Sequence, residues 1–481
     1  MTELHYLSAT DAIERFRSRE LSPVELMEAV ITRAEEVEPT VNALCHTFYG
    51  EALEQARAAA ARYAGRGEPP RPLEGIPTAV KEEEAIAGQP WTQGSLIYKD
   101  LVADHTSAFA RRHLEAGAIV HARTTAPEFS CAGFTQSRIW GVTRNPWNPA
   151  YAVGGSSGGS GAALASGTTT LASGSDIGGS IRIPASFNGI VGYKPPYGRV
   201  PVDPPFNLDT YCHCGPMART VADCALYQNQ VAGPDPSDIT TLRPKLLLPE
   251  RFEGVEGLRV ALSVDLGSWP VDPEVRANTL AVGDALRAAG ATVDEVDLVV
   301  PRAEVELATA IHFHLAFADW IGLQVREHGE LVTAYAAEVA RWCAEVAEGH
   351  TFLEELELEA RLYAPVGALL EEYDALICPT AATRGLLADD DYVGRGLEVG
   401  GEQLEFYLQG LLTPVFNVMS RCPVLSVPSG FADNGVPTGV QIAGRTYDDE
   451  TVFRLGAALE SERPWFDVEE RRPVVAATAE A

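Results

Sequence analysis

Short apolar runs separated by glycine and proline turns dominate the chain from Pro72 onward, and helical patterns lie between them. Seven of these runs are GIPTAV, GAIVHA, GIVGY, LRVALS, ALICP, VLSVP and GVQIA. Runs of this length are typical of strands buried on both faces, and their alternation with helices is typical of α/β proteins. We therefore expect an α/β sheet protein with helices on both faces of the sheet.

Helical patterns without such runs occupy the first part of the chain. Ser8 and Asp11 precede AIERF, and Ser22–Glu25 indicates a capping box with proline at the first helical position, ahead of LMEAVITRAEEV. The segment EALEQARAAAARYAG predicts a further helix. We expect residues 1–70 to form N-terminal helices that pack on a core of residues 71–470.

Residues 300–373 lack the strand pattern and predict two or three long helices, including EVELATAIHFHLAFADWIGLQVREHG and LVTAYAAEVARWCAEVAEG. They form either one more covering layer or a cap over a substrate cleft, and we assign them as a helical cap region. Residues 388–403 are polar and glycine-rich, which is typical of a surface loop. We expect residues 471–481 to form a flexible tail.

The charge balance limits the classes of partner. The 481 residues carry 37 Lys and Arg against 67 Asp and Glu, a formal net charge of -30. Such a surface repels nucleic acid and acidic lipid, so a neutral or cationic small molecule is the better substrate. No apolar run is long enough to span a membrane, and the N-terminus lacks a signal-peptide pattern. The eight cysteines show no disulfide framework, so we expect reduced thiols and a cytoplasmic protein.

Two glycine-serine clusters, GGSSGGS at 154–160 and DIGGS at 176–180, invite three interpretations. A phosphate-binding P-loop requires a lysine after its last glycine, but Ala162 follows Gly161. A nucleophile elbow matches GSSGG at 155–159, yet the preceding NPWNPAYAV, with two prolines, is a poor buried strand. A serine-rich turn without chemistry remains the third interpretation.

A lysine near these clusters raises the possibility of a histidine-free site. Lys81 closes the apolar segment PLEGIPTAVK. Such a lysine is more often a surface anchor. However, a serine nucleophile needs a base, and a desolvated lysine in its neutral form can serve as one.

Five long segments together resemble the amidase signature family of serine hydrolases. The resemblance covers Ser8 to Phe466, nearly the whole chain. The segments are PLEGIPTAVK, GVTRNPWNPAYAVGGSSGGSGAALASG, SDIGGSIRIPASFNGIVGYKPPYGRV, CGPMARTVADCA and CPVLSVPSGFADNGVPTGVQIAGR.

This resemblance implies a Ser-cisSer-Lys triad. Ser180 matches the nucleophile, Lys81 matches the base, and Ser156 matches the bridging serine that follows a cis peptide bond from Gly155. Backbone N–H groups match an oxyanion hole, with that of Ser180 as an optional addition: Ile177, Gly178 and Gly179. Three further residues match positions that support the site: Ser157, Asp176 and Arg182.

Two of the departures of the chain from the family pattern bear on the site. The lysine is followed by Glu82, Glu83 and Glu84, where the family commonly has Asp and then Asn. Carboxylates beside the amine oppose its use as a base, so we expect at least some of them to point away or to be paired. By resemblance, the divergent segment PEFSCAGFTQSRIW lines the acyl pocket, with four expected substrate contacts: Phe129, Ser130, Cys131 and Trp140. Cys131 has the alternative role of a small buried apolar residue.

Metal-type residues occur, but in poor patterns. Cys212, His213 and Cys214 lack a fourth ligand and the usual C-x-x-C spacing of zinc sites. His312 and His314 lie two apart on a predicted helix and so face different directions. We therefore expect neither a metal nor a cofactor.

We predict a large mixed central sheet covered by helices, and an amidohydrolase that cleaves a C–N amide bond of a small molecule through an acyl-serine. The same machinery extends to carbamates and esters. Two alternatives are the glutaminase-type subunit of a tRNA-dependent amidotransferase and a noncatalytic binding protein of the same fold. Small-molecule substrates are the expected partners, and a homodimer is left open.

Overall fold

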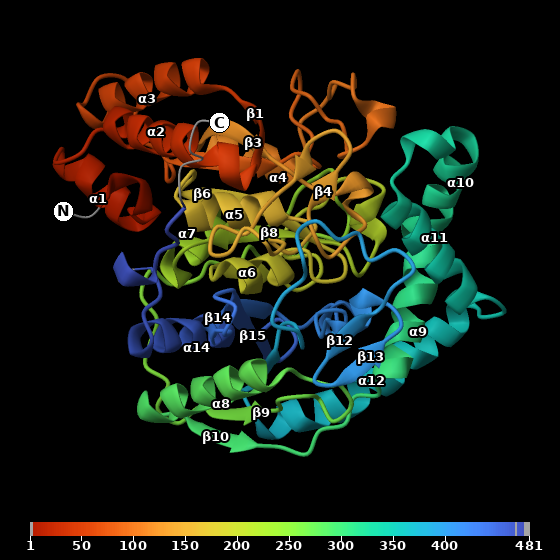
Figure 1. Ribbon diagram of the computed structural model, residues 1–481. Helices are drawn as coiled ribbons and strands as arrows, with labels where there is room; N and C mark the ends of the chain where they lie inside the picture. Colours follow the sequence, from red (N-terminus) through yellow and green to blue (C-terminus); the bar gives the residue numbers. More distant parts are fainter. Residues whose placement is uncertain (1–2, 467–468, 476–481) are drawn as a thin grey trace.

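An eleven-stranded mixed sheet runs through the centre of the protein in a computed structural model that describes residues 3–466 and 469–475 (Figure 1). Its strand order is β1-β3-β2-β6-β8-β7-β14-β15-β11-β9-β10, and it contains both parallel and antiparallel pairs. The strands are β1 (Leu44–Thr47), β2 (Pro77–Lys81), β3 (Ile119–Thr124), β6 (Leu171–Asp176), β7 (Val191–Lys194), β8 (His213–Ala218), β9 (Arg259–Leu262), β10 (Thr292–Glu295), β11 (Ala375–Pro379), β14 (Val424–Phe431) and β15 (Pro437–Gly444). The predicted fold class is confirmed.

All seven apolar runs in the sequence lie in strands of this sheet. Two central strands did not stand out as apolar runs. β6 reads LASGSD and β8 reads HCGPMA, and both are fully buried in spite of their small and polar side chains. They lie side by side in antiparallel register, between the strand that ends in Lys81 and the C-terminal strands.

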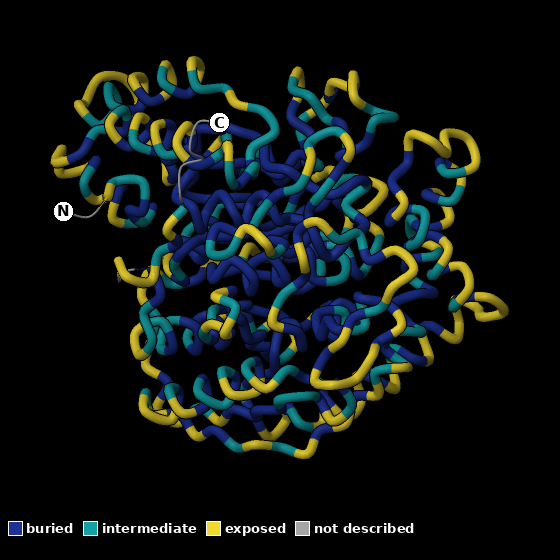
Figure 2. Tube along the Cα trace, in the orientation of Figure 1, coloured by how far each residue is buried: buried dark blue, intermediate teal, exposed yellow. Residues whose placement is uncertain are grey.

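Helices cover both faces of the sheet. Neighbouring residues of a strand point to opposite faces, and on β14 the Ser426 Oγ donates to the Arg182 carbonyl of α6 at 3.3 Å, while the Leu425 side chain lies against Gly456 of α14. Figure 2 shows that the buried part of the chain is concentrated in the middle of the molecule, where the sheet lies. Helices outside the 300–373 region are α1 (Ala9–Ser18), α2 (Pro23–Val41), α3 (Tyr49–Tyr63), α4 (Ala108–Glu115), α5 (Gly158–Ser166), α6 (Arg182–Asn188), α7 (Val221–Val231), α8 (Pro273–Ala288), α13 (Val415–Val418) and α14 (Asp449–Glu462).

The N-terminal helices begin where the sequence predicts. The Ser8 hydroxyl accepts the Asp11 N–H at 3.1 Å, and Ser22 and Glu25 form the expected capping box. The Asp223 carboxylate of α7 accepts the N–H of Ala9 at 2.8 Å and so joins α1 to the core of the molecule.

Residues 300–373 form four helices at one side of the sheet (Figure 1). They are α9 (Arg302–Phe313), α10 (Asp319–His328), α11 (Ala334–Ala347) and α12 (Phe352–Glu372). The predicted helix over 304–329 is interrupted by a π-helical turn at His314–Ala318. α9 is the centre of this group, because it packs against both α11 and α12.

Three smaller expectations have different outcomes. The segment 388–403 is not entirely loop, because a hairpin of β12 (Leu397–Val399) and β13 (Glu402–Leu404) turns at Gly400 and Gly401, whose φ angles are 57° and 83°. In the predicted tail, the Arg472 guanidinium lies over the Tyr6 ring, and residues 476–481 lie outside the described residues. No described helix is long and apolar enough to cross a membrane.

A buried ionic contact joins α9 and α12 to the segment that leads into β8. His312 contacts the Glu355 Oε1 through Nδ1 at 2.5 Å and the Asp209 Oδ1 through Nε2 at 2.7 Å, and its ring stacks on Tyr211. Burial alone lowers the pKa of His312, but the hydrogen bonds and charges of the two carboxylates outweigh it and raise the pKa to about 9. His312 is therefore protonated at neutral pH.

This contact predicts a pH-dependent stability. The folded pKa is about 9 and the ordinary pKa of histidine is 6.5, so the contribution is complete below pH 6.5 and is lost as the pH rises through 9. At full size it amounts to about 3 kcal/mol. Urea denaturation between pH 6 and 10 should show a smaller loss of unfolding free energy for His312→Gln than for wild type. The exposed His350→Gln is the control; equal slopes for wild type and His312→Gln would contradict the assignment.

Candidate active site

Lys81 is a fully enclosed charged group of the site. It ends β2, its side chain is 0% exposed, and its backbone N–H donates to the Ser173 Oγ of β6 at 2.8 Å. Its Nζ lies 2.7 Å from the Ser156 Oγ and 2.8 Å from the Ser175 Oγ. The pairing of β2 with β6 therefore brings the lysine to the Ser175 hydroxyl, and the turn before α5 supplies the Ser156 hydroxyl.

Ser156 and Ser180 lie on two different turns. Ser156 follows a cis peptide bond from Gly155 and lies in the turn before α5, while Ser180 lies between β6 and α6. The Ser157 N–H donates to the Ser180 carbonyl at 3.2 Å, which joins the two turns. Among the described residues no hydrogen bond links the hydroxyls of Ser156 and Ser180. The structure thus contains the lysine-to-serine contact, and the second proton-transfer contact remains a prediction.

The expected oxyanion donors fall into two groups. The N–H groups of Ile177 and Gly178 donate to no other group in the described part of the chain. The Gly179 N–H instead donates to the Asp176 Oδ1 at 2.8 Å. Gly179 has a φ of 124°, and a Cβ there would collide with the Thr413 side chain, so only glycine fits. Two of the three predicted donors are free to bind an oxyanion.

Asp176 and Arg182 brace the turn that carries Ser180. Both side chains are 0% exposed, and Arg182 Nη2 lies 2.8 Å from the Asp176 Oδ1. Asn417 donates to the same carboxylate oxygen at 2.9 Å. Burial opposes ionisation, but the charge and hydrogen bonds of Arg182 and the hydrogen bond from Asn417 outweigh it and lower the pKa of Asp176. The turn is therefore held by a fixed negative charge.

The structure adds serines that the sequence analysis did not single out. Ser175 contacts the lysine amine, and Ser173 accepts its backbone N–H. Ser157 accepts the Ser175 N–H at 3.3 Å, in keeping with its predicted support role. Ser173 and Ser175 are two apart on β6, so they share a face of the strand. The S-x-S spacing in LASGSD is the signal that would have indicated them.

The three glutamates after Lys81 point in different directions. Glu82 accepts the Thr92 N–H, and Glu84 accepts the Ser107 hydroxyl at 2.7 Å, so both point away from the amine. Glu83 does not, because its Oε2 lies 2.6 Å from the Lys81 Nζ. The expectation that some carboxylates point away holds for two of the three.

Glu83 is ionised beside the lysine. Burial favours its neutral form, but the Lys81 charge and hydrogen bonds from Lys81, Ser130 and Ser175 outweigh burial and lower the pKa of Glu83. The buried Arg123 guanidinium supports this turn by donating to the carbonyl oxygens of Lys81 and Glu82 at 3.0 and 3.2 Å. The site therefore contains the Lys81–Glu83 ion pair beside the Lys81–Ser156 hydrogen bond.

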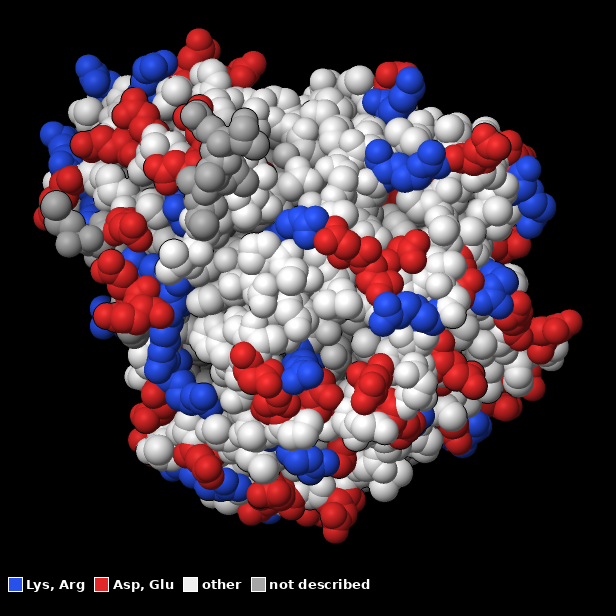
Figure 3. Space-filling view, in the orientation of Figure 1, with Lys and Arg blue, Asp and Glu red and all other residues white. Residues whose placement is uncertain are grey.

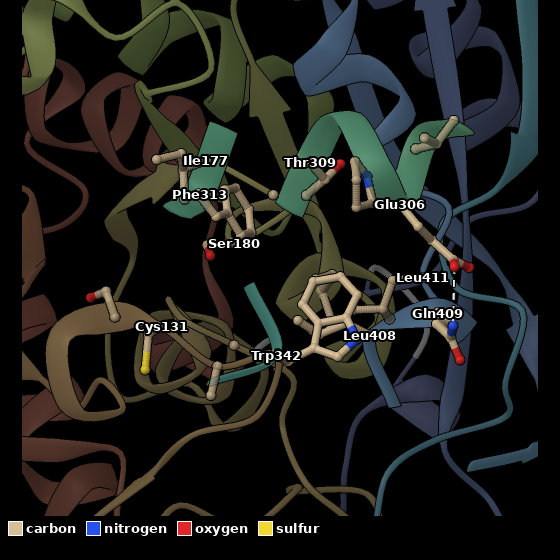
Figure 4. A pocket seen from close by; sticks show the side chains of 18 of the residues that line it. Cys131, Ile177, Ser180, Glu306, Thr309, Phe313, Trp342, Leu408, Gln409 and Leu411 are labelled. Carbon is tan, nitrogen blue, oxygen red and sulfur yellow. Dashed lines mark hydrogen bonds between the residues drawn. The ribbon is translucent and has the colours of Figure 1, made fainter. Parts of the chain in front are cut away.

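A pocket of about 700 Å³, including its open mouth, lies beside Ser180 (Figure 4). Its wall is mostly apolar and aromatic, and residues from α9, α11 and the turn before α10 contribute to it. The lining residues are Ser130, Cys131, Ala132, Gly133, Gly155, Ile177, Gly178, Ser180, Ile183, Trp269, Val305, Glu306, Thr309, Phe313, Phe317, Trp342, Leu408, Gln409, Leu411 and Pro414.

Two of the four expected substrate contacts lie in this wall and two do not. Ser130 and Cys131 line the pocket. Phe129 has a φ of 53°, which turns its ring against Trp320 at 5.0 Å between centroids. Trp140 lies between the strands of the β4–β5 hairpin (Gln136–Ser137 and Gly141–Val142), and its ring packs against His46. Neither residue lines this pocket, so their roles as substrate contacts stay a prediction that the pocket does not support.

Most pocket residues were not predicted from the sequence. Phe313, Phe317 and Trp342 lie on cap helices, where an apolar residue facing a pocket has the same pattern as one facing the core. No signal in the sequence distinguishes them.

Among the described residues, one cluster could hold a metal ion: His312, Glu355 and Glu359, whose ligand-type atoms lie within 4.8 Å of one another. Both nitrogens of His312 already contact carboxylates, as expected of an imidazolium rather than of a metal ligand. In the Cys212–Cys214 tripeptide, Cys214 donates to Glu84 and the His213 ring lies 2.7 Å from the Tyr211 carbonyl. Cys214 and His213 therefore contact different partners.

Comparison with known proteins gives a consistent result. The model of the Amidase family matches residues 25–453. An acylamidase of Rhodococcus erythropolis is 34% identical over 490 residues, covering 97% of this chain and 98% of the relative. A glutamyl-tRNA(Gln) amidotransferase subunit of Thermosynechococcus vestitus is 33% identical, covering 93% and 96%. The crystal structure of a bacterial aryl acylamidase of the amidase signature family superimposes with a TM-score of 0.88 at 29% identity, covering 98% and 100%.

The Glu83 contact predicts a shifted pH profile. A carboxylate 2.6 Å from the amine favours the charged lysine, which cannot act as a base. Replacing Glu83 by Gln should therefore move the rising limb of kcat/KM against pH downward by about one unit. Glu83→Asp keeps the charge and should leave the limb close to its wild-type position. An unchanged or upward-shifted limb in Glu83→Gln would show that this carboxylate does not control the base.

Proposed function

This chain belongs to the amidase family, and we propose that it hydrolyses small-molecule amides through an acyl-enzyme on Ser180, with Ser156 and Lys81 as the proton path. That the chain is a hydrolase of C–N amide bonds follows from the family and its acylamidase relatives. The observation that carries the mechanism is the 2.7 Å contact between the Lys81 Nζ and the Ser156 Oγ, in a buried site beside the pocket that Ser180 lines.

The first half of the reaction acylates Ser180. With its amine neutral, Lys81 accepts the proton of Ser156 while Ser156 accepts the proton of Ser180. The Ser180 Oγ then bonds to the substrate carbonyl carbon, and the carbonyl oxygen takes the negative charge. We assign the stabilisation of that oxygen to the N–H groups of Ile177 and Gly178, which have no acceptor in the described part of the chain.

The second half releases both products. Ser156 passes a proton to the departing nitrogen and is reprotonated by Lys81, so the C–N bond breaks and the amine leaves. Water then attacks the acyl carbon, its proton follows the same path, and Ser180 leaves as its hydroxyl. The carboxylic acid is the second product. A carbamate offers the same carbonyl and nitrogen leaving group, so it enters the same sequence of steps.

The pocket supports an autonomous amidohydrolase over a glutaminase-type subunit. Glutamine carries an α-carboxylate, which needs a cationic or multiply hydrogen-bonding partner. The lining residues include no Lys, Arg or His. Overall identity does not separate the two interpretations, since it is 34% for the acylamidase and 33% for the amidotransferase relative. An apolar acyl group suits this wall better than a glutamine does.

Substitution of the serines should rank them by role. Ser180→Ala should reduce amide turnover by at least about a thousandfold, since it removes the nucleophile. Ser156→Ala should be nearly as severe because it interrupts the proton path. Ser157→Ala should be milder, as it removes a brace. Steady-state kinetics on an anilide tests the order, and a Ser157→Ala more damaging than Ser156→Ala would contradict it.

A second experiment separates the proposed function from its alternatives. The purified chain, alone, is treated with a fluorophosphonate probe, digested and analysed by mass spectrometry, and its turnover of a panel of anilides, primary amides and carbamates is measured. We expect labelling of Ser180 and amide turnover without partner chains. Absence of labelling would support a noncatalytic protein, and turnover only after addition of partner subunits would support the amidotransferase interpretation.

A further inference from the structure

Glu306 is the one charged side chain among the residues that line the pocket. It projects from α9 at the end of the pocket away from Ser180, with apolar groups such as Trp342 and Leu411 between the two (Figure 4). A carboxylate in such a wall is costly to bury unless it has a partner.

The carboxylate is held in a fixed direction. Gln409 donates through its Nε2 to the Glu306 Oε2 at 3.0 Å. The Gln409 amide is itself oriented, because its Oε1 accepts the Phe406 N–H at 3.0 Å. The NH₂ group of Gln409 is thus assigned to Glu306 by its surroundings. A fixed carboxylate favours recognition because little freedom is lost on binding.

The charge of Glu306 is only partly compensated. Its nearest cation is Arg302, whose Nε lies 3.6 Å from the Glu306 Oε1, beyond hydrogen-bond range. Arg302 instead donates to the Glu402 Oε1 at 3.1 Å. Burial raises the pKa of Glu306, against the effects of Gln409 and Arg302. A cation in the pocket would complete the pairing.

The remaining wall also suits a cation attached to an apolar body. Trp269, Phe313, Phe317 and Trp342 line the pocket, and aromatic faces attract ammonium groups. Trp342 is held by stacking on Phe406 at 4.8 Å between centroids. The protein carries a net charge of -30, and Figure 3 shows Asp and Glu side chains spread over one face. This field raises the local concentration of cations.

We infer that the enzyme prefers amides whose apolar acyl group ends in a cationic nitrogen, which binds the Glu306 carboxylate at the far end of the pocket. Glu306 is then a specificity-determining residue and takes no part in the bond-breaking steps. The inference rests on the proposed function, because it assigns the pocket to the acyl group. Its structural alternative is that Glu306 only joins α9 to Gln409 and pairs with Arg302, one turn earlier on the same helix.

The test compares two anilides of nearly equal shape. One carries a 4-(aminomethyl)benzoyl group and the other a 4-ethylbenzoyl group, so that an ammonium replaces a methyl. Wild type should show a kcat/KM for the cationic anilide that is higher by roughly tenfold or more, the lower end for a charge-assisted contact. Glu306→Gln should reduce that ratio by roughly tenfold.

A matched control isolates the charge at the pocket. Glu304→Gln removes one negative charge from the same helix, but Glu304 pairs with Arg361 at 3.4 Å and does not line the pocket. It should leave the ratio unchanged. Preference of wild type for the neutral anilide, or the same ratio in Glu306→Gln as in wild type, would overturn the inference.

Binding to an inactive variant separates this inference from the proposed function. Calorimetric titration of Ser180→Ala with both anilides measures the affinity ratio without turnover, and Ser180→Ala/Glu306→Gln gives the matched value. If Ser180→Ala binds the cationic anilide more tightly and the double variant does not, the inference is supported. If wild type hydrolyses neither anilide, that result counts against the proposed function and leaves the inference standing. Equal affinities for the two anilides would overturn the inference.

Discussion

The enclosed amine of Lys81 is the contact on which the rest of the site depends. It lies within 2.8 Å of Ser156, Ser175 and Glu83, and each partner comes from a different segment. A buried ammonium is stable only when such partners surround it, and a buried neutral amine is a base only when they do not hold its proton. Three features hold the amine in this position. β2 lies next to β6, the turn before α5 supplies Ser156, and Arg123 donates to the carbonyl oxygen of Lys81.

The sheet could be predicted from the sequence where burial demands apolar side chains. Strands such as β11 and β15 are recognisable because both faces of their residues are covered. β6 could not be recognised as a buried strand from the sequence, because it carries serines of the site in place of apolar side chains. β8 could not be recognised either, because a glycine and a proline interrupt its apolar pattern. The least regular strands therefore lie nearest the proposed chemistry.

The site could be predicted in part because motif spacing reports on local turns. Glycines occur around Ser156 and Ser180 where a larger side chain would collide with a neighbour, as at Gly179, and such glycines can be seen in the sequence. Side chains that meet only in the folded structure have no comparable pattern in the sequence. Glu83 and Glu84 are neighbours in sequence, yet one contacts the lysine and the other Ser107. Trp140 illustrates the converse, because its closeness in sequence to Cys131 does not bring it to this pocket.

The most direct test of this account is the pH dependence of kcat/KM for Lys81→Ala, measured on an amide and on an ester of the same acyl group. The neutral amine is the proposed base, so wild-type activity on the amide should rise with pH and level off on the alkaline side. Lys81→Ala should lose that rise and most of the amide rate, while the ester, whose leaving group needs less protonation, should be affected less. A variant that kept the wild-type pH profile and amide rate would contradict the assignment of Lys81 as the base.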